Sequence, residues 1–268
     1  MSAPAPTTIA RFAGISDVRL VLRQLRYEQL SFWLNPVGAI FTVVFSVVFL
    51  VMLGLSAGSS RVSYLENIKL VQYYVPAFVA YGVMAACFTT LSISLVIRRE
   101  TGLLKRLRLS PLPTWGLLAA VVLSTVVIAL IQVVLLLAVG RWGFGVHLPS
   151  DPGAFVVALL VGVSSFTALG IAMSTIIPNQ ESAGPLTSTL FFVLLFLSGL
   201  WFPIKSGSQL AHISTWFPIR HFLKAVFAAF NAHGESPWAW KDLLVLAIWG
   251  AAGAVVALRR FQWAPRRG

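Results

Sequence analysis

Long runs of apolar residues, separated by short polar stretches, dominate the chain. A run of about 20 apolar residues is long enough to cross a lipid bilayer as an α-helix. Charged residues are rare within these runs and frequent between them. The pattern therefore predicts an all-α integral membrane protein with six transmembrane helices. The predicted spans are residues 37–55, 72–97, 114–139, 154–177, 186–202 and 242–258.

The stretch before the first span predicts an amphipathic helix over residues 15–33. Arg19, Arg23 and Arg26 share one arc of its helical wheel. The apolar arc holds Ile15, Val18, Val21, Leu22 and Leu25. A basic helix with an apolar face next to a span is typical of a helix that lies in the membrane interface. We therefore expect a cytoplasmic N-terminal region, residues 1–36, with an interfacial helix; a soluble cap or a frayed tail is the alternative.

The region between the fifth and sixth spans, residues 203–240, is only partly apolar and contains several helix breakers. Trp201-Phe202-Pro203 at its start is echoed by Trp216-Phe217-Pro218. Two such corners around a short helical stretch favour an outer re-entrant hairpin, whose non-helical backbone must be buried in protein or face a cavity. An ordinary interfacial loop is the alternative interpretation.

Composition agrees with the membrane class. The chain is 58% hydrophobic and only 10% charged, against about 25% charged in average soluble domains. With both termini inside, thirteen of the 20 basic residues fall in cytoplasmic segments, including a basic tail over residues 259–268. That bias follows the positive-inside rule and argues against a nucleic-acid partner. Arginine outnumbers lysine fifteen to five, which favours the cell membrane of a bacterium.

Several kinds of chemistry are missing from the pattern. Acidic residues fall only in loops or at the ends of the predicted spans, which argues against a proton-coupled carrier. No GxxxxGK[ST] phosphate-binding loop occurs, so any ATP must be bound by another subunit. The single cysteine, Cys87, excludes a disulfide framework. The histidines fall in predicted outer segments with no metal-binding spacing, and we interpret them as surface residues: His147, His212, His221 and His233.

The most charged run joins the second and third spans. Residues 98–113 include five arginines or lysines and read Arg-Arg-Glu-Thr-Gly-Leu-Leu-Lys-Arg-Leu-Arg-Leu-Ser-Pro-Leu-Pro. Leu103, Leu104 and Leu107 share one face at helical spacing. The order Arg-Glu-x-Gly-x-Leu-Lys-Arg-Leu-x-x-Ser-Pro-Leu resembles the first cytoplasmic loop of ABC-2 type permeases, the membrane subunits of ATP-driven exporters such as the daunorubicin-type drug exporters.

The resemblance implies a coupling helix that sits in a groove of a separate ABC ATPase subunit. The residues it singles out for this contact are Glu100, Gly102, Leu103, Leu104, Arg106, Leu107 and Pro111. Lys105 departs from the family, which often carries glutamate there. The family works as two membrane subunits with two ATPases, so a second permease copy or a paralogue is the other expected partner, besides membrane lipid. ATP and magnesium would bind the ATPase, and this chain itself would bind no cofactor.

Candidate substrate contacts are the hydroxyls of Thr89 and Ser92 on the second span and three aromatic rings on the fifth, Phe191, Phe192 and Phe196. Such hydroxyls also bond commonly to their own or a neighbouring helix. The uncharged, aromatic fifth span favours export of a lipophilic drug, antibiotic or lipid-like metabolite. The alternatives are a polysaccharide or glycolipid exporter, a membrane enzyme acting on lipid, and a membrane scaffold without transport activity.

Overall fold

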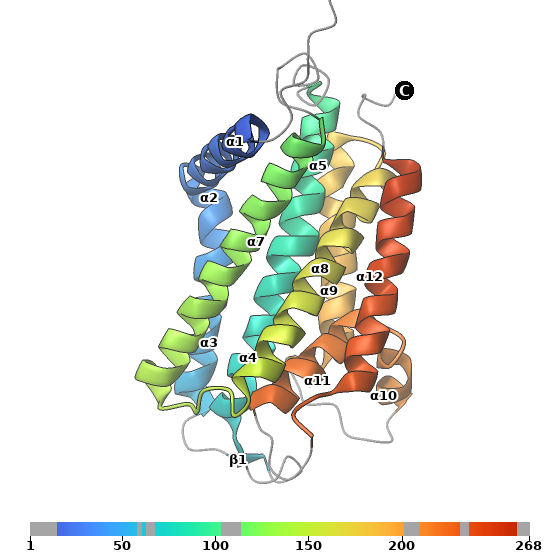
Figure 1. Ribbon diagram of the computed structural model, residues 1–268. Coiled ribbons are helices and arrows are strands. Elements are labelled where there is room, and N and C mark those ends of the chain that lie inside the picture. The colour runs from blue at the N-terminus through green and yellow to red at the C-terminus, as the bar shows by residue number, and fades with distance from the viewer. Residues whose placement is uncertain are drawn as a thin grey trace, which may run out of the picture.

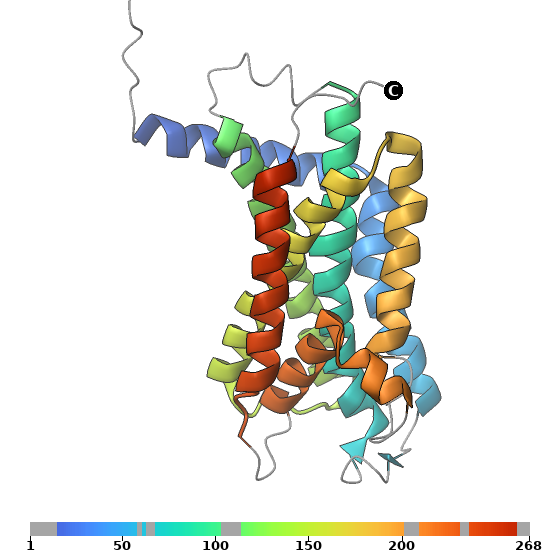
Figure 2. The ribbon, with the colours of Figure 1, turned by 90° about the vertical axis from the view of Figure 1, so that its right-hand side faces the viewer.

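An amphipathic helix, α1 (Ile15–Trp33), lies crosswise over one end of a bundle of long, roughly parallel helices in the computed structural model (Figures 1 and 2). The structure describes residues 15–57, 61–62, 68–102, 114–200, 209–230 and 236–261. The bounds of α1 confirm the helix predicted over residues 15–33. Its position across the end of the bundle defines one pole of the molecule, called here the α1 pole.

After α1 the chain forms the bundle in order. The helical elements are α2 (Pro36–Ala39), η1 (Ile40–Val44), α3 (Phe45–Ala57), α4 (Leu70–Met84), η2 (Ala85–Thr90), α5 (Leu91–Glu100), α7 (Thr114–Ala138), η3 (Val139–Gly143), α8 (Pro152–Ile176), α9 (Gln180–Ser198), α10 (Gln209–Ser214), α11 (Pro218–Phe230) and α12 (Trp240–Arg260). The three η segments are short π-helical turns within longer helices. A small antiparallel hairpin of β1 (Arg61–Val62) and β2 (Ile68–Lys69) lies at the pole opposite α1 (Figure 1).

Five helices in the described part of the chain are long and apolar enough to cross a membrane. They are Leu70–Glu100, Gly116–Gly143, Pro152–Ile176, Gln180–Ser198 and Trp240–Arg260. The first predicted span corresponds to α2, η1 and α3, whose apolar part, Thr42–Ser56, is shorter. The all-α membrane class predicted from the sequence is thus confirmed, and the protein is a multi-pass membrane protein.

The core of the bundle surrounds α4, in which every residue from Val71 to Met84 is buried. The backbones of η2, α8 and α12 approach one another closely at two glycines. A Cβ on Gly170 of α8 would lie 2.4 Å from the carbonyl oxygen of Cys87 in η2. A Cβ on Gly253 of α12 would lie 2.9 Å from the backbone nitrogen of Leu169. Small residues at these points let α8 pack tightly on the central helix and on α12.

Several helix boundaries differ from those predicted, and two of the differences have a clear local cause. The fifth long helix begins at Gln180, six residues before the predicted span, because the Asn179 side chain accepts a hydrogen bond from Ser182 N (2.9 Å) and so caps the helix. The predicted second span ends at residue 97, but α5 continues to Glu100 and is closed by Gly102 at φ 69°. Residues 98–100, predicted as part of a loop, are therefore the last turn of a helix.

The described residues between α9 and α12 form two short helices at the pole opposite α1. The chain turns at Trp216 and Phe217, and α11 then enters the bundle, with most of its residues buried (Figure 2). The ring of Phe222 packs where Gly162 of α8 leaves room, since a Cβ there would lie 2.2 Å from the ring. In the described residues, α10 and α11 thus lie on either side of the second aromatic-proline corner, Trp216-Phe217-Pro218. The first corner, Trp201-Phe202-Pro203, lies outside the described residues.

Candidate functional site

The last turn of α5 carries two adjacent arginines, Arg98 and Arg99, at the α1 pole. Consecutive residues of an α-helix point about 100° apart, so the two side chains reach different neighbours. Arg98 contacts α1, and Arg99 contacts the end of α8. The helix end that leads into residues 103–113 is thereby attached to two other elements. We call this arrangement the arginine fork.

Arg99 caps the carboxyl end of α8. Its guanidinium is only 3% exposed and donates to the carbonyl oxygens of Ser174 (2.9 Å) and Ile177 (2.8 Å). Its Nε donates to the Glu100 carboxylate (2.7 Å). The last carbonyls of a helix lack partners within the helix and carry partial negative charge, so a cation placed there is stabilising. Arg99 therefore holds the α8–α9 turn against the end of α5.

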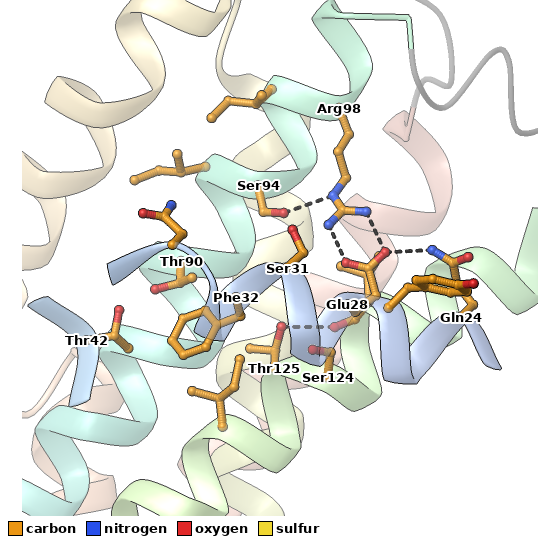
Figure 3. Close-up of a pocket in the computed structure, with 16 residues that line it drawn as sticks. Gln24, Glu28, Ser31, Phe32, Thr42, Thr90, Ser94, Arg98, Ser124 and Thr125 are labelled. Atoms are coloured by element: carbon orange, nitrogen blue, oxygen red, sulfur yellow. Dashed lines mark hydrogen bonds and ion pairs between the residues drawn. The ribbon is translucent and has the colours of Figure 1, made fainter. Parts of the chain in front are cut away.

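Arg98 forms a bidentate ion pair with Glu28 of α1 (Figure 3). Arg98 Nη1 lies 2.8 Å from Glu28 Oε1, and Arg98 Nε donates to Ser94 Oγ at 3.1 Å. Gln24 Nε2 also donates to Glu28 (2.8 Å). Glu28 is buried, which is tolerable for a carboxylate only with such partners. Glu28 was not singled out from the sequence; an acidic residue within a helix rich in arginine is the signal that could have shown it.

A cavity of about 820 Å³ lies below this ion pair, between α1, α5 and α7 (Figure 3). Thr42 of η1 and Thr90 of η2 line its inner part. Its wall combines hydroxyl groups with apolar side chains. The lining residues are Gln24, Tyr27, Glu28, Ser31, Phe32, Asn35, Thr42, Thr90, Ile93, Ser94, Ile97, Arg98, Val121, Ser124, Thr125 and Ile128.

Of the predicted coupling residues, Glu100 and Gly102 lie in the described part of the chain. Glu100 accepts the hydrogen bond from Arg99, and Gly102 ends α5 in a left-handed conformation that favours glycine. The other predicted coupling residues lie outside the described residues: Leu103, Leu104, Arg106, Leu107 and Pro111.

The five predicted substrate contacts have different surroundings in the structure. Ser92 is fully buried and donates toward the carbonyl oxygens of Phe88 (2.5 Å) and Gly170 (2.8 Å), a helix-packing role. The hydroxyl of Thr89 is buried and has no hydrogen-bond partner among the described residues. The three rings of α9 divide between two faces: Phe191 packs against Tyr81, whereas Phe192 and Phe196 are exposed.

The two predicted faces of α1 are only partly as expected. Arg19, Arg23 and Arg26 are exposed. Of the apolar arc, Val21 is buried, whereas Val18 and Leu22 are more than half exposed. The helix turns Glu28 and Phe32 toward the bundle instead, because Arg98 supplies the counter-charge and the cavity receives the ring. The apolar face is therefore shared between the bundle and the surroundings.

One histidine interpretation was wrong. His221 is not a surface residue: it is 8% exposed, and its Nδ1 lies 2.5 Å from Asp242 Oδ1 at the start of α12. Its Nε2 lies 2.8 Å from the carbonyl oxygen of Thr215. The hydrogen bond to Asp242 raises the pKa of His221. A histidine that joins α11 to α12 could not be found from sequence spacing, because its partner lies 21 positions further along the chain.

Comparison with known proteins agrees with this architecture. YbhR of Escherichia coli K12, named as a probable multidrug ABC transporter permease, is 23% identical over 200 residues, which are 74% of this chain and 54% of YbhR. YvfS of Bacillus subtilis 168, named as a transport permease, is 26% identical over 178 residues, 65% of this chain and 70% of YvfS. The chain thus spans about half the length of YbhR. The model of the ABC-2 type transporter family matches residues 20–231, and the chain belongs to that family of ABC transporter membrane subunits.

Proposed function

We propose that this protein is the permease subunit of an ABC exporter that moves a lipophilic substrate, such as a drug, an antibiotic or a lipid-like metabolite, out of the cell. ATP would be hydrolysed by a separate ABC ATPase, which is how permeases of this family generally work. The multidrug designation of YbhR supports the lipophilic substrate class. So does the high hydropathy of the long helices of the bundle.

The observation that carries the proposal is the arginine fork. It ties the segment that enters residues 103–113 to α1 through Glu28 and to the α8–α9 turn through Ile177. A force applied to that loop would reach both elements through these direct contacts. We propose that closure of the ATPase dimer moves residues 102–109, tilts α4–α5 and α9, and opens an outward path between two permease subunits.

The proposed topology places the α1 pole in the cytoplasm of a bacterium, with α1 lying in the inner interface. The stretch from Pro36 to Ala57 then supplies the first of six spans. Its continuous helical turns measure about 33 Å at 1.5 Å per residue, enough to cross the hydrocarbon core. The α10–α11 hairpin becomes an outer re-entrant element. The domain layout is an interfacial N-terminal region (1–36), a six-span domain (37–258) and a cytoplasmic tail (259–268).

Co-purification tests the proposal. The tagged permease, expressed in its host membrane and extracted in mild detergent, is expected to bring down an ABC ATPase and show ATP hydrolysis. Changing Leu103→Asp and Leu107→Asp together should abolish the association. The control is Leu258→Asp, an exposed leucine near the end of α12 at the same pole. Loss of the ATPase in the control as well, or a clean preparation with no ATPase and no ATP dependence, would favour a scaffold and overturn the exporter.

A further inference from the structure

The cavity below α1 has the dimensions and lining of a small-molecule site. Its volume of about 820 Å³ falls in the range of roughly 300–1,000 Å³ typical of pockets for drug-sized ligands. Its deep end is closed by buried side chains of α7 and η1, among them Val121, Thr125, Ile128 and Thr42. Its α1 end is bordered by exposed residues, including Tyr27 and Ser31. The cavity is thus bordered by exposed residues at the level of α1 and by buried residues within the bundle.

The charges at the cavity neutralise each other. Both carboxylate oxygens of Glu28 accept from Arg98, and Gln24 donates to the same carboxylate. Arg98 Nε is bonded to Ser94. A ligand with its own net charge would have to displace this bidentate pair or leave its charge uncompensated, which is costly in a largely apolar wall. The lining therefore favours a neutral ligand.

The hydroxyl groups within the cavity offer acceptors. Thr90 Oγ1 donates to the carbonyl oxygen of Ala85 (3.1 Å), and Thr125 Oγ1 donates to that of Val121 (3.0 Å). Each hydroxyl has one proton and two lone pairs, so both oxygens remain available to accept. Around them lie apolar groups, including Ile93. The complementary ligand has an apolar body that carries hydroxyl or amide N–H groups.

We propose that this cavity binds a neutral, drug-sized amphiphile with O–H or N–H donors, taken up from the inner leaflet beneath α1. The inference deepens the proposed function, since it rests on a lipophilic substrate and on α1 lying at the inner surface. The proposal places the first contact between substrate and transporter within one permease chain, next to α1, which Arg98 of the arginine fork holds. The bound molecule is either the transported substrate or a neutral membrane lipid of the same chemistry.

Binding of a fluorescent probe to the purified permease without any ATPase tests the site. Phenylnaphthylamine is neutral and carries one N–H group, whereas anilinonaphthalenesulfonate has the same rings and an added negative charge. Saturable fluorescence enhancement is expected with the neutral probe and not with the sulfonate. Equal saturable binding of both probes, or unsaturable partitioning of the neutral one, would overturn the proposal.

Two sets of variants locate the binding. Ser31→Phe narrows the cavity at its α1 end and should lower the affinity for the neutral probe about tenfold, or about 1.4 kcal/mol. Ser164→Phe, at an exposed serine of α8 outside the cavity, should leave binding unchanged. The double variant Thr90→Val, Thr125→Val keeps the shape of the cavity but removes both hydroxyl acceptors. Its affinity for the neutral probe should fall about fivefold or more. Unchanged affinity in these properly folded variants would refute the location.

Competition distinguishes the two sources of ligand. Diacylglycerol added to the delipidated protein displaces the probe if a neutral lipid occupies the cavity. An exported drug that displaces the probe, with diacylglycerol inert, assigns the cavity to the substrate. Displacement by neither would contradict the ligand class. Because these measurements use the permease alone, they stay informative even if the ATPase association fails.

Discussion

The guanidinium of Arg99 lies 2.8 Å from the carbonyl oxygen of Ile177, at the point where α8 ends. The two residues are 78 positions apart in the chain. Their contact attaches the end of α5 to the short turn between two long helices. Beside it, Arg98 attaches the same turn of α5 to α1. Any movement at the start of residues 103–113 is thus expected to displace three elements of the α1 pole: the end of α5, the α8–α9 turn and α1.

Replacing Arg99 with leucine should uncouple and destabilise this pole. The change leaves the carbonyls of Ser174 and Ile177 buried without their donors, at a cost of about 2 kcal/mol. Thermal unfolding in detergent should therefore occur at lower temperature, and ATP hydrolysis in the assembled complex should lose its response to substrate. Arg19→Leu, at an exposed arginine of α1, is the matched control. Equal stability of the Arg99 and Arg19 variants would contradict the capping role.

Glu28 and Arg98 should show strong energetic coupling. Each single change, Glu28→Gln or Arg98→Gln, leaves the other charge partly buried without its partner. The double variant removes both charges and should be less destabilised than the sum of the single changes, by about 1–3 kcal/mol. A double-mutant cycle from the free energies of unfolding measures this difference. Simple additivity would mean that the ion pair contributes nothing to attaching α1.

Gly170 should tolerate no side chain. A Cβ there would lie 2.4 Å from the backbone oxygen of Cys87, so Gly170→Ala should force α8 away from η2 and cost about 1–3 kcal/mol. A Cβ on Gly184 of α9, by contrast, would meet no atom within 4 Å. Gly184→Ala should thus be neutral or stabilising by about 0.5–1 kcal/mol, as helix propensity predicts. The melting temperature of Gly170→Ala should therefore lie below that of Gly184→Ala, and equal melting temperatures would contradict the close contact at Gly170.

The contact between His221 and Asp242 should make stability depend on pH. Both ring nitrogens of His221 face acceptors, the Asp242 carboxylate and the carbonyl of Thr215. A neutral imidazole donates only once, so the protonated form fits this environment, and the pKa of His221 is raised, chiefly by the hydrogen bond to Asp242. Arg220 and Lys224 are the cations nearby, and the charge on Lys224 opposes the rise.

Because the folded pKa lies above the unfolded value of about 6.5, the stabilisation is complete below that pH and declines as pH rises through the folded pKa. The melting temperature of the wild type should therefore exceed that of His221→Gln most at a pH of about 6. The gap should shrink in alkaline buffer. A gap that widened with rising pH would show that His221 is neutral in the folded protein.

Much of the architecture was accessible from periodicity and hydropathy. The bounds of α1 follow from its arginine and apolar arcs, and the apolar runs correspond to the long helices of the bundle. The start of α9 was missed because the predicted span began after Pro185. The helix begins earlier, at the residue after the Asn179 cap, since proline is tolerated in the early turns of a helix. Composition and run length thus indicated the type of the elements and their approximate positions better than their ends.

The candidate site was less accessible. Residues 98–113 were predicted to contact an ATPase, with Arg98 and Arg99 interpreted only as charges of a loop. Their partners are not near them in the chain: Glu28 precedes Arg98 by 70 residues, and Ile177 follows Arg99 by 78. The hydroxyls of Thr90 and Ser94 lie on one predicted span, but nothing in the pattern indicated that α1 and α7 would enclose them in a cavity.

The membrane class, the amphipathic first helix and the family follow from the amino-acid sequence, because they depend on hydrophobicity and on the order of residues along one element. Which side chains meet became known from the three-dimensional structure. That outcome depends on the rotation of each helix about its axis and on where glycines such as Gly170 allow close approach. A difference of one residue turns a helical side chain by about 100°, enough to direct Arg98 to α1 and Arg99 to α8.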